Sequence, residues 1–384
     1  MAHSLSFSPR NSNRSIYQRL TNLNWFMILL LVMVAGIGCA MLYSVAGGQW
    51  DPWASRQAMR FGMAFILMLA IAVTSLRFWM AFSYPAYFLG LIMLVAVEFV
   101  GSTGMGGMRW LDLGVMRVQP SELMKVAVIM ALARYYHGVS LEDARKLSSM
   151  IMPLLIILLP GILIIRQPDL GTTILLMAGG ISIIFMSGMK SWIFWVGGIA
   201  GLASIPIGWR FLRDYQKERV LTFLNPERDP LGAGYQITQA KIAAGSGGTY
   251  GKGFLNGTQS HLNFLPEMKT DFIFSVLLEE FGIMGGGVLI LLYLILLTYA
   301  LLVALTCRNQ FGRLMAMGLS ITLFLYLFIN VAMVMGLLPV VGVPLPMVSY
   351  GGSAMLTMMI AYGLILAVAI NRDLNLPRVD AFGR

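Results

Sequence analysis

Long apolar runs recur along this chain, and they limit the folds open to it more than any other feature. A helix of about 20 residues crosses the roughly 30 Å hydrocarbon layer of a bilayer, and the first run, 25–46, is long enough to do so. We expect ten membrane helices, over the ranges 25–46, 59–75, 78–100, 121–136, 150–165, 170–188, 191–208, 280–304, 313–336 and 352–371.

The composition excludes the main alternatives to a helical membrane protein. Hydrophobic residues make up 58% of the 384 residues and charged residues only 11%, whereas soluble domains carry about 25% charged residues. Outer-membrane barrels alternate apolar and polar residues, but the runs here are continuous. We therefore predict an all-α, polytopic integral membrane protein with about ten transmembrane helices and one long extracytoplasmic loop.

The net charge of +10 fits a membrane protein without any nucleic-acid partner. In membrane proteins Lys and Arg collect at helix ends and in loops, where they face anionic headgroups. The two cysteines, Cys39 and Cys307, have no disulfide or metal-site spacing, and the three histidines are scattered. We expect a membrane surface, and neither nucleic acid nor zinc, around this chain.

The basic residues of the short loops predict the orientation. With the N-terminus inside, thirteen Lys and Arg fall on the cytoplasmic side and six on the outer side. Short loops rich in Lys and Arg stay in the cytoplasm. We therefore expect a cytoplasmic N-terminal tail (1–24), a ten-helix membrane domain (25–371) and a cytoplasmic C-terminal tail (372–384), with the long loop 209–272 outside.

The long loop contains the largest shift in composition. A loop of this length is uncommon unless it is functional. Its glycine-rich stretch, 232–257, has two open interpretations. It is either a flexible linker or, because residues 235–242 have helical spacing, an amphipathic surface helix.

Five polar clusters interrupt the apolar pattern on the predicted outer side. Ionisable groups beside membrane spans are costly to desolvate, so each is a functional candidate. The clusters are Arg109-Trp110, Gln119-Pro120-Ser121-Glu122 with Lys125, Gln167-Pro168-Asp169-Leu170-Gly171, Glu267 with Thr270 and Asp271, and Ser349-Tyr350-Gly351-Gly352-Ser353. We expect them to share one outward cavity. Helix caps and a tight turn are the alternative interpretation.

The pair Glu267 and Asp271 is the strongest single feature. Carboxylates four residues apart share one face of a helix. Such a pair is tolerated when a cation or a sugar occupies the site, or when one carboxyl is protonated. The apolar neighbour Phe272 would raise a carboxylate pKa towards that of a general base. A solvated helix start is the alternative. Glu279 and Glu280, on a further turn, either line the cavity or brace the helix, and neither is assigned a role.

Together these pieces resemble the SEDS family (shape, elongation, division and sporulation) of bacterial peptidoglycan glycosyltransferases. The resemblance covers nearly the whole chain, to about residue 371. Besides the first three clusters, it rests on Phe264-Leu265-Pro266-Glu267, Thr270-Asp271-Phe272-Ile273-Phe274 and Pro346 with the Ser349 cluster. The segments 257–260 and 340–346 are more similar to the elongation branch than to the division branch.

The resemblance implies an activity and a location. The chain would polymerise lipid II into glycan strands at the outer face of the bacterial cytoplasmic (inner) membrane, during cell elongation and rod-shape maintenance. A sugar 4-hydroxyl would attack the anomeric carbon of an undecaprenyl-linked glycan chain, and undecaprenyl pyrophosphate would leave. Such a reaction needs a base for the hydroxyl and cations for the pyrophosphate.

The resemblance also implies roles for individual residues. Asp271 matches the essential aspartate of the family and is the expected base, and Glu267 is a second catalytic carboxylate that orients the acceptor or shares a divalent ion. Arg109 and Lys125 are expected on the pyrophosphate, with Arg56 and Arg60 as further outer cations. The full expected substrate-binding set is Arg109, Lys125, Glu122, Gln119, Asp169, Thr270 and Ser349, in which Asp169 and Glu122 hold the cations.

Cofactors and partners follow from the same resemblance. A divalent cation, Mg²⁺ or Mn²⁺, suits a pyrophosphate leaving group, but the chain has no dedicated metal motif, and we expect no organic cofactor. The family works with a class B penicillin-binding protein transpeptidase and the elongation machinery. The alternatives are a lipid II flippase or transporter, and a cell-wall scaffold. Clusters at one face and nearly uncharged mid-span regions favour the enzyme.

Overall fold

The computed structural model describes residues 16–104, 107–112, 114, 117–211, 214–225, 233–261 and 267–376. It is mostly helical, and a helix occupies each of the ten predicted ranges. These helices are α2 (Trp25–Val45), α3 (Trp53–Ala72), α4 (Leu76–Val100), α5 (Pro120–Gly138), α7 (Ile151–Arg166), α8 (Leu170–Met186), α9 (Ser191–Phe211), α13 (Ile273–Thr306), α14 (Gln310–Val334) and α15 (Gly352–Ile370).

Among the described residues, six helices are long and apolar enough to cross a membrane: α2, α4, η1 (Leu147–Met150) continued by α7, α13, α14 and α15. Helix α8 and the first part of α9 are apolar but shorter. Helices α3 and α5 carry charged residues near their starts. The chain is therefore an integral membrane protein with a mostly helical fold.

Polar side chains set several helix starts. Asn24 accepts a hydrogen bond from the Met27 N–H at 3.1 Å before α2, and Asn309 accepts one from Gly312 before α14. Such caps satisfy N–H groups that the helix itself leaves unpaired. They fix where the chain enters α2 and α14.

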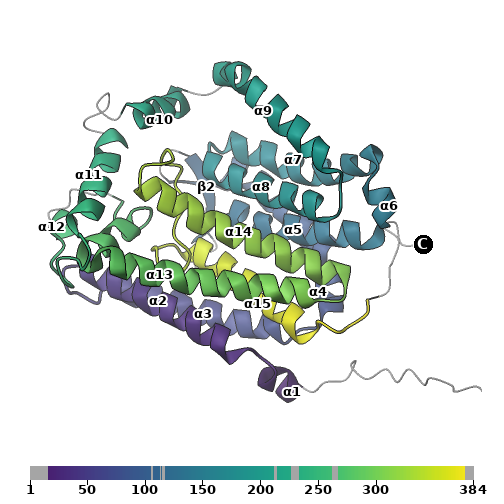
Figure 1. Ribbon diagram of the computed structural model, residues 1–384, viewed down its shortest axis with the longest axis horizontal. Helices are drawn as coiled ribbons and strands as arrows, with labels where there is room; N and C mark the ends of the chain where they lie inside the picture. The colour runs from purple at the N-terminus through teal and green to yellow at the C-terminus, as the bar shows by residue number, and fades with distance from the viewer. Residues whose placement is uncertain are drawn as a thin grey trace, which may run out of the picture.

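The long helices lie side by side in one bundle, with α14 across its centre (Figure 1). Helix α15 packs against α3 so closely that a Cβ at Gly363 would lie 2.9 Å from the Met68 carbonyl oxygen. Close approach at small residues is typical of membrane helices, where packing replaces the hydrophobic effect. Helix α9 is different, because nearly all its described side chains are exposed.

A small antiparallel sheet joins α4 to α5, and the all-α prediction missed it. Its strands are β1 (Ser102–Gly104), β2 (Gly107–Asp112) and β3 (Arg117–Val118), in the order β1-β2-β3. Trp110 pairs with Ser102 and Leu111 with Val118. The sheet carries Arg109 and Trp110 to the end of the bundle where α5 begins.

The long loop contains helices of its own, namely α10 (Asp214–Leu224), α11 (Ala233–Ser246) and α12 (Thr258–His261). Helix α11 covers the segment expected to be an amphipathic surface helix. It buries Ile237, Ala240 and Ala243 and packs against α13 and α14. Figure 1 shows α11 and α12 together at one end of the bundle, with α6 (Leu141–Ala144) at the other.

The glycine-rich part of the loop is docked into a break in α13. At Gly282 the backbone leaves the helical region, with a φ of 65° and a ψ of −166°. A Cβ at Gly251 would overlap the Glu280 carbonyl oxygen, so only glycine allows this approach. Four backbone hydrogen bonds fill the break: Ile283 N to Gly248 O, Met284 N to Thr249 O, Lys252 N to Glu279 O, and Gly253 N to Glu280 O, all between 2.9 and 3.1 Å.

Two buried glutamates hold the same junction. Glu279 accepts a hydrogen bond from the Lys252 ammonium at 2.6 Å and another from the Thr258 hydroxyl at 3.0 Å. Glu280 accepts one from the Ser44 hydroxyl of α2. Both side chains are fully buried, so their partners are needed to offset the loss of water. These glutamates therefore brace the loop against α13, which was one of the two roles that the sequence left open.

Candidate active site

A cavity of about 330 Å³ opens at the α11 end of the bundle, and residues from all five polar clusters line it. We call it the acidic cavity, because four carboxylates border it. Its polar lining side chains are Arg109, Trp110, Gln119, Glu122, Asp169, Thr172, Gln236, Glu267, Thr270, Asp271 and Tyr350. The structure thus brings together clusters that lie up to 241 residues apart in the sequence.

The predicted catalytic pair lies directly before α13. Asp271 and Glu267 are both half-buried and both line the acidic cavity. The Glu267 carboxylate accepts a hydrogen bond from the Thr270 hydroxyl at 2.8 Å, and its backbone carbonyl accepts one from the Phe272 N–H. The segment therefore forms a compact turn, and Thr270 orients one of the two carboxylates.

Three contacts, one from α14 and two from the segment before α15, fix this turn. The Ser349 hydroxyl donates to the Thr270 carbonyl at 2.5 Å, and the Tyr350 N–H donates to the Lys269 carbonyl at 2.8 Å. The Asn330 amide of α14 donates to the Asp271 carbonyl at 2.9 Å. Backbone contacts on both sides hold Asp271 at the cavity wall without using its carboxylate.

Ser349 lies in this wall and not in the lining of the cavity. It is buried, and its hydroxyl also accepts a hydrogen bond from the Leu345 N–H at 2.7 Å. Both of its hydrogen bonds therefore go to the backbone. The structure places this predicted substrate-binding residue where it supports Thr270.

Gln119 and Asp169 meet across the acidic cavity. The Gln119 amide donates to one Asp169 oxygen at 2.8 Å, and the other oxygen caps α8 through the Thr172 N–H at 3.1 Å. The capping interpretation of Asp169 is therefore correct, and the same carboxylate also borders the cavity. Gln119 ties the start of α5 to the start of α8.

Glu122 and Lys125 form a buried ion pair, with 2.7 Å between the Lys125 ammonium and Glu122 Oε1. The Tyr326 hydroxyl donates to Glu122 Oε2 at 2.6 Å, and the Lys125 ammonium lies 4.4 Å from the Tyr326 ring centre. Glu122 borders the cavity, but Lys125 does not and is almost fully buried. The expected contact of Lys125 with pyrophosphate is not supported by this placement, which makes Lys125 the counterion of Glu122.

Arg109 lines the acidic cavity as expected, and two of its N–H groups are already used. Its Nε donates to the Gln167 carbonyl at 3.0 Å, and its Nη2 donates to the Pro168 carbonyl. These carbonyls end α7, where the helix dipole favours a cation. Arg109 therefore ties the sheet to the α7–α8 turn, and its remaining N–H groups are the part that can face a substrate.

A second, larger cavity of about 810 Å³ adjoins the first, and both share Trp110, Thr270, Tyr350 and Gly351. Its charged lining side chains are Arg56, Arg60, Asp112 and Arg117, so we call it the basic cavity. The Arg60 guanidinium lies 4.7 Å from the Tyr350 ring centre, and Arg117 approaches Asp112 at 3.5 Å. Two cavities of opposite charge thus meet at Tyr350.

Several of these residues escaped the sequence analysis. Tyr326 lies within an apolar run, where a single tyrosine gives no signal of a buried ion pair. Arg117 lies just outside the predicted clusters, two residues before Gln119. Gln236 lies in the segment for which a linker and a helix were both possible. The signature residues Phe264, Leu265 and Pro266 lie outside the residues that the structure describes.

The model of the cell cycle protein family that groups FtsW, RodA and SpoVE matches residues 19–374. The chain belongs to this family. It is a SEDS protein, as the motifs indicated.

The relatives of this SEDS protein agree in sequence and in fold. The peptidoglycan glycosyltransferase MrdB of Escherichia coli K12 is 42% identical over 365 residues, covering 95% of this chain and 98% of the relative. A chain from a solved peptidoglycan synthase complex matches with a TM-score of 0.79 and 30% identity, over 92% of this chain and 99% of that one. The rod shape determining protein RodA of Thermus thermophilus matches with a TM-score of 0.69 and 26% identity, over 92% and 98%.

Proposed function

We propose that this SEDS protein is a peptidoglycan glycosyltransferase of the RodA type, which polymerises lipid II during cell elongation. One observation carries the proposal: the half-buried carboxylate Asp271 lies on an acidic cavity that adjoins a basic one. A base and an anion-binding surface next to each other are what the transfer of a sugar from a pyrophosphate requires. The names of the relatives point to the same reaction.

In the proposed reaction the acceptor 4-hydroxyl lies in the acidic cavity against Asp271. The Asp271 carboxylate takes the hydroxyl proton as the oxygen bonds to the anomeric carbon, while the bond from that carbon to the pyrophosphate oxygen breaks. Glu267, held by Thr270, accepts a hydrogen bond from a neighbouring sugar hydroxyl and orients the acceptor. The electron pair of the broken bond leaves with undecaprenyl pyrophosphate.

The pyrophosphate leaves into the basic cavity. Arg56 and Arg60 line that cavity and form no ion pair among the described residues, so their positive charges are available to an anion. Guanidinium groups bind phosphate oxygens in pairs, through a planar fork. The free N–H groups of Arg109 contribute from the other side of Trp110.

A divalent cation is compatible with this site only together with the substrate. The described residues contain no group of three or more His, Cys, Asp or Glu close enough to hold a metal ion. Mg²⁺ keeps several waters and is usually held by one or two carboxylates plus substrate phosphates. Asp271 and Glu267 would hold it here, where it would neutralise charge on the pyrophosphate. Activity measured before and after chelation, with Mg²⁺ or Mn²⁺ restored, tests this point.

The proposed topology has ten spans, both termini in the cytoplasm and the acidic cavity outside. It adds α3, α5, α8 and α9 to the six candidate spans, and it places α10 to α12 on the outer side. Cysteine at the exposed position Tyr250, in a background lacking Cys39 and Cys307, should react with an impermeant thiol reagent on intact spheroplasts. Cysteine at the exposed position Ser148 should react only after lysis. The reverse pattern would invert the topology and remove the active site from the outer face.

The transpeptidase partner is proposed to be a class B penicillin-binding protein supplied by another chain, with the elongation machinery around it. This rests on the fold match to a chain from a peptidoglycan synthase complex. Polymerisation by the purified chain, with and without that partner, measures what the partner contributes.

Purified protein with lipid II in detergent tests the reaction itself. Asp271→Asn keeps the shape of the side chain but cannot accept the proton, so it should lower turnover by about a hundredfold to ten-thousandfold. The matched control is Asp373→Asn, an exposed carboxyl at the opposite end of the bundle, which should polymerise normally. No membrane is crossed in this assay, so a flippase would show no turnover with either protein. Near wild-type turnover by Asp271→Asn would remove Asp271 as the base.

A further inference from the structure

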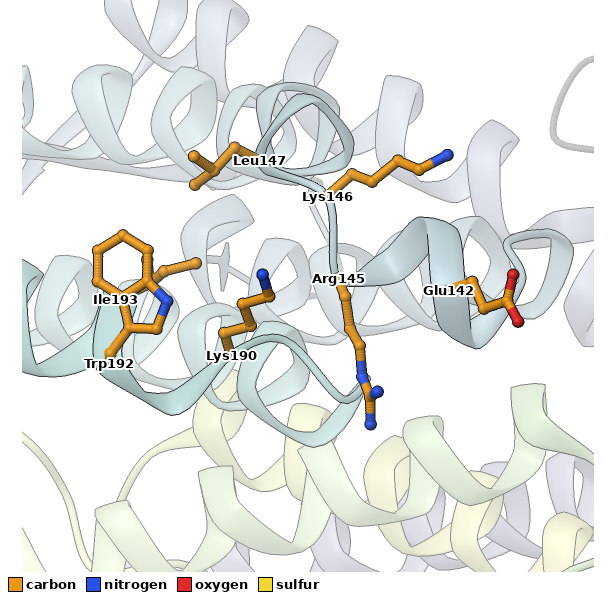
Figure 2. Close-up of a pocket in the computed structure, with 7 residues that line it drawn as sticks. All are labelled: Glu142, Arg145, Lys146, Leu147, Lys190, Trp192 and Ile193. Atoms are coloured by element: carbon orange, nitrogen blue, oxygen red, sulfur yellow. The ribbon is translucent and has the colours of Figure 1, made fainter.

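The end of the bundle opposite the acidic cavity carries a cavity of its own. Helices α5 and α8 both begin at the acidic cavity, so the turns that follow them lie at the far end, beside α6 (Figure 1). An open cavity of about 500 Å³ lies between these turns, within the usual size range of ligand sites. Its lining residues are Glu142, Arg145, Lys146, Leu147, Lys190, Trp192 and Ile193 (Figure 2).

Two of the three cations in this pocket lack a carboxylate partner among the described residues. Lys146 pairs with Asp143 at 2.7 Å, and this hydrogen bond lowers the pKa of the Asp143 carboxyl. Arg145 and Lys190 form no ion pair with any residue that the structure describes. In Figure 2 the Lys190 ammonium points into the space between Arg145 and Trp192, while the Glu142 carboxylate points away from it. The pocket therefore presents uncompensated positive charge.

The other side of the pocket is apolar and continues into the membrane-facing surface. Leu147 and Trp192 are 60% and 53% exposed. After Leu147, helix α7 exposes apolar side chains such as Ile151 and Leu155. After Trp192, helix α9 exposes Trp195 and Ile199. Tryptophan is enriched where membrane helices reach the headgroup layer. The cations thus lie where two apolar helix surfaces begin.

We propose that this pocket binds an anionic phospholipid of the leaflet opposite the active site. Arg145 and Lys190 contact the headgroup phosphate, Trp192 packs beside the headgroup, and the acyl chains follow the exposed sides of α7 and α9. Basic pockets between membrane helices hold anionic headgroups in this way. An acidic protein segment would also bind these cations, but it would leave the apolar surfaces of the two membrane helices uncovered.

Native mass spectrometry of the delipidated, detergent-purified full chain tests the proposal. The added lipids are diphosphatidylglycerol, phosphatidylglycerol and, as the uncharged control, phosphatidylethanolamine. The double variant Arg145→Gln with Lys190→Gln should lose roughly thirtyfold in affinity for the anionic lipids. It should keep the wild-type melting temperature and wild-type polymerisation in detergent.

The matched control removes the same charge elsewhere at the same end. Arg77 lies at the start of α4, and Arg308 lies in the turn before α14. Both are exposed and lie outside this pocket. Arg77→Gln with Arg308→Gln should change lipid affinity less than twofold. Equal losses in the two double variants would show that net charge alone attracts the lipid, and this would overturn the pocket.

A second measurement separates a lipid from a protein partner in cells. A photoreactive benzoylphenylalanine replaces Leu147 in cells grown with radioactive phosphate. A labelled adduct that phospholipase releases supports the proposal, and so does its loss in the Arg145→Gln, Lys190→Gln background. A crosslink to a polypeptide with no phospholipid adduct would overturn it in favour of an acidic protein segment.

Discussion

The acidic and basic cavities share lining residues, but the charged side chains of the acidic cavity have more partners within the protein. In the acidic cavity Glu122, Asp169 and Glu267 each accept a hydrogen bond from a neighbouring side chain. In the basic cavity Arg56 and Arg60 have no ion pair among the described residues. Fixed partners orient a group for one geometry, whereas unpaired cations remain available to an incoming anion. The difference indicates that the first cavity is preorganised and that the second is completed by its substrate.

The largest effect should come from the only lysine expected on the substrate, Lys125, because it is the buried counterion of Glu122. Lys125→Met leaves that carboxylate buried without its cation and should destabilise the fold by about 3–5 kcal/mol. Thermal unfolding in detergent measures this. The double variant Glu122→Gln with Lys125→Met should regain most of the loss. A stable single variant with a raised KM for lipid II would instead make Lys125 a substrate contact.

The cations of the basic cavity should show the opposite behaviour, with loss of turnover and an unchanged fold. Arg60→Ala removes a cation that would stabilise the departing pyrophosphate and should lower kcat by about a hundredfold, near 3 kcal/mol. Arg117→Ala serves as the control, because Arg117 is exposed and already near Asp112, and it should lose much less. Equal losses at both positions would contradict an anion site centred on Arg60.

Arg109 lines the acidic cavity next to Trp110, which both cavities share, and should show an intermediate effect. Lysine at this position keeps the charge but cannot donate to both α7 carbonyls and still face the substrate. Arg109→Lys should therefore lower turnover by about tenfold, and Arg109→Ala by more. Steady-state rates on lipid II in detergent distinguish the two variants. Full activity of the alanine variant would leave Arg109 with a purely structural role.

The smallest effect should come from Ser349, which the structure places in the wall of the acidic cavity. Ser349→Ala removes a hydrogen bond to Thr270 and leaves the Leu345 N–H unpaired, so stability should fall by about 1 kcal/mol. The KM for lipid II should stay within about twofold of the wild type. A large change in KM at constant stability would restore the predicted substrate contact.

The sequence was sufficient for the helices and for the grouping of the polar clusters. Unbroken apolar runs and a small set of helix caps determine where helices form, and a helix lies over every predicted range. The start of α13 was predicted at residue 280, seven residues late. The first turns of α13 contain Glu279 and Glu280, whose charges hide the helix in the sequence. The helix continues past the break at Gly282 because the docked loop forms hydrogen bonds there.

Features that depend on tertiary contacts could not be read from the sequence. Lys125 and Glu122 are three residues apart in any helix, but only the approach of Tyr326 from α14 shows that they are buried. Strand β2 has only six residues and lies beside glycines, so it is too short to show the alternation of apolar and polar residues that predicts a strand. For the segment 232–257 the helix was the correct alternative, because α11 is a packed helix, whereas the glycines after it are held in the α13 break and do not form a flexible linker.

The junction at Gly282 has a mechanical consequence. The segment 273–281 is bonded to the loop 248–258 through backbone and glutamate contacts, and only Phe272 separates that segment from Asp271. The same loop also bonds to Ile283 and Met284, so it connects the two parts of α13 on either side of Gly282. A displacement of the loop would therefore be transmitted to Asp271 through this segment, and the contacts of Ser349, Tyr350 and Asn330 with the turn would resist it.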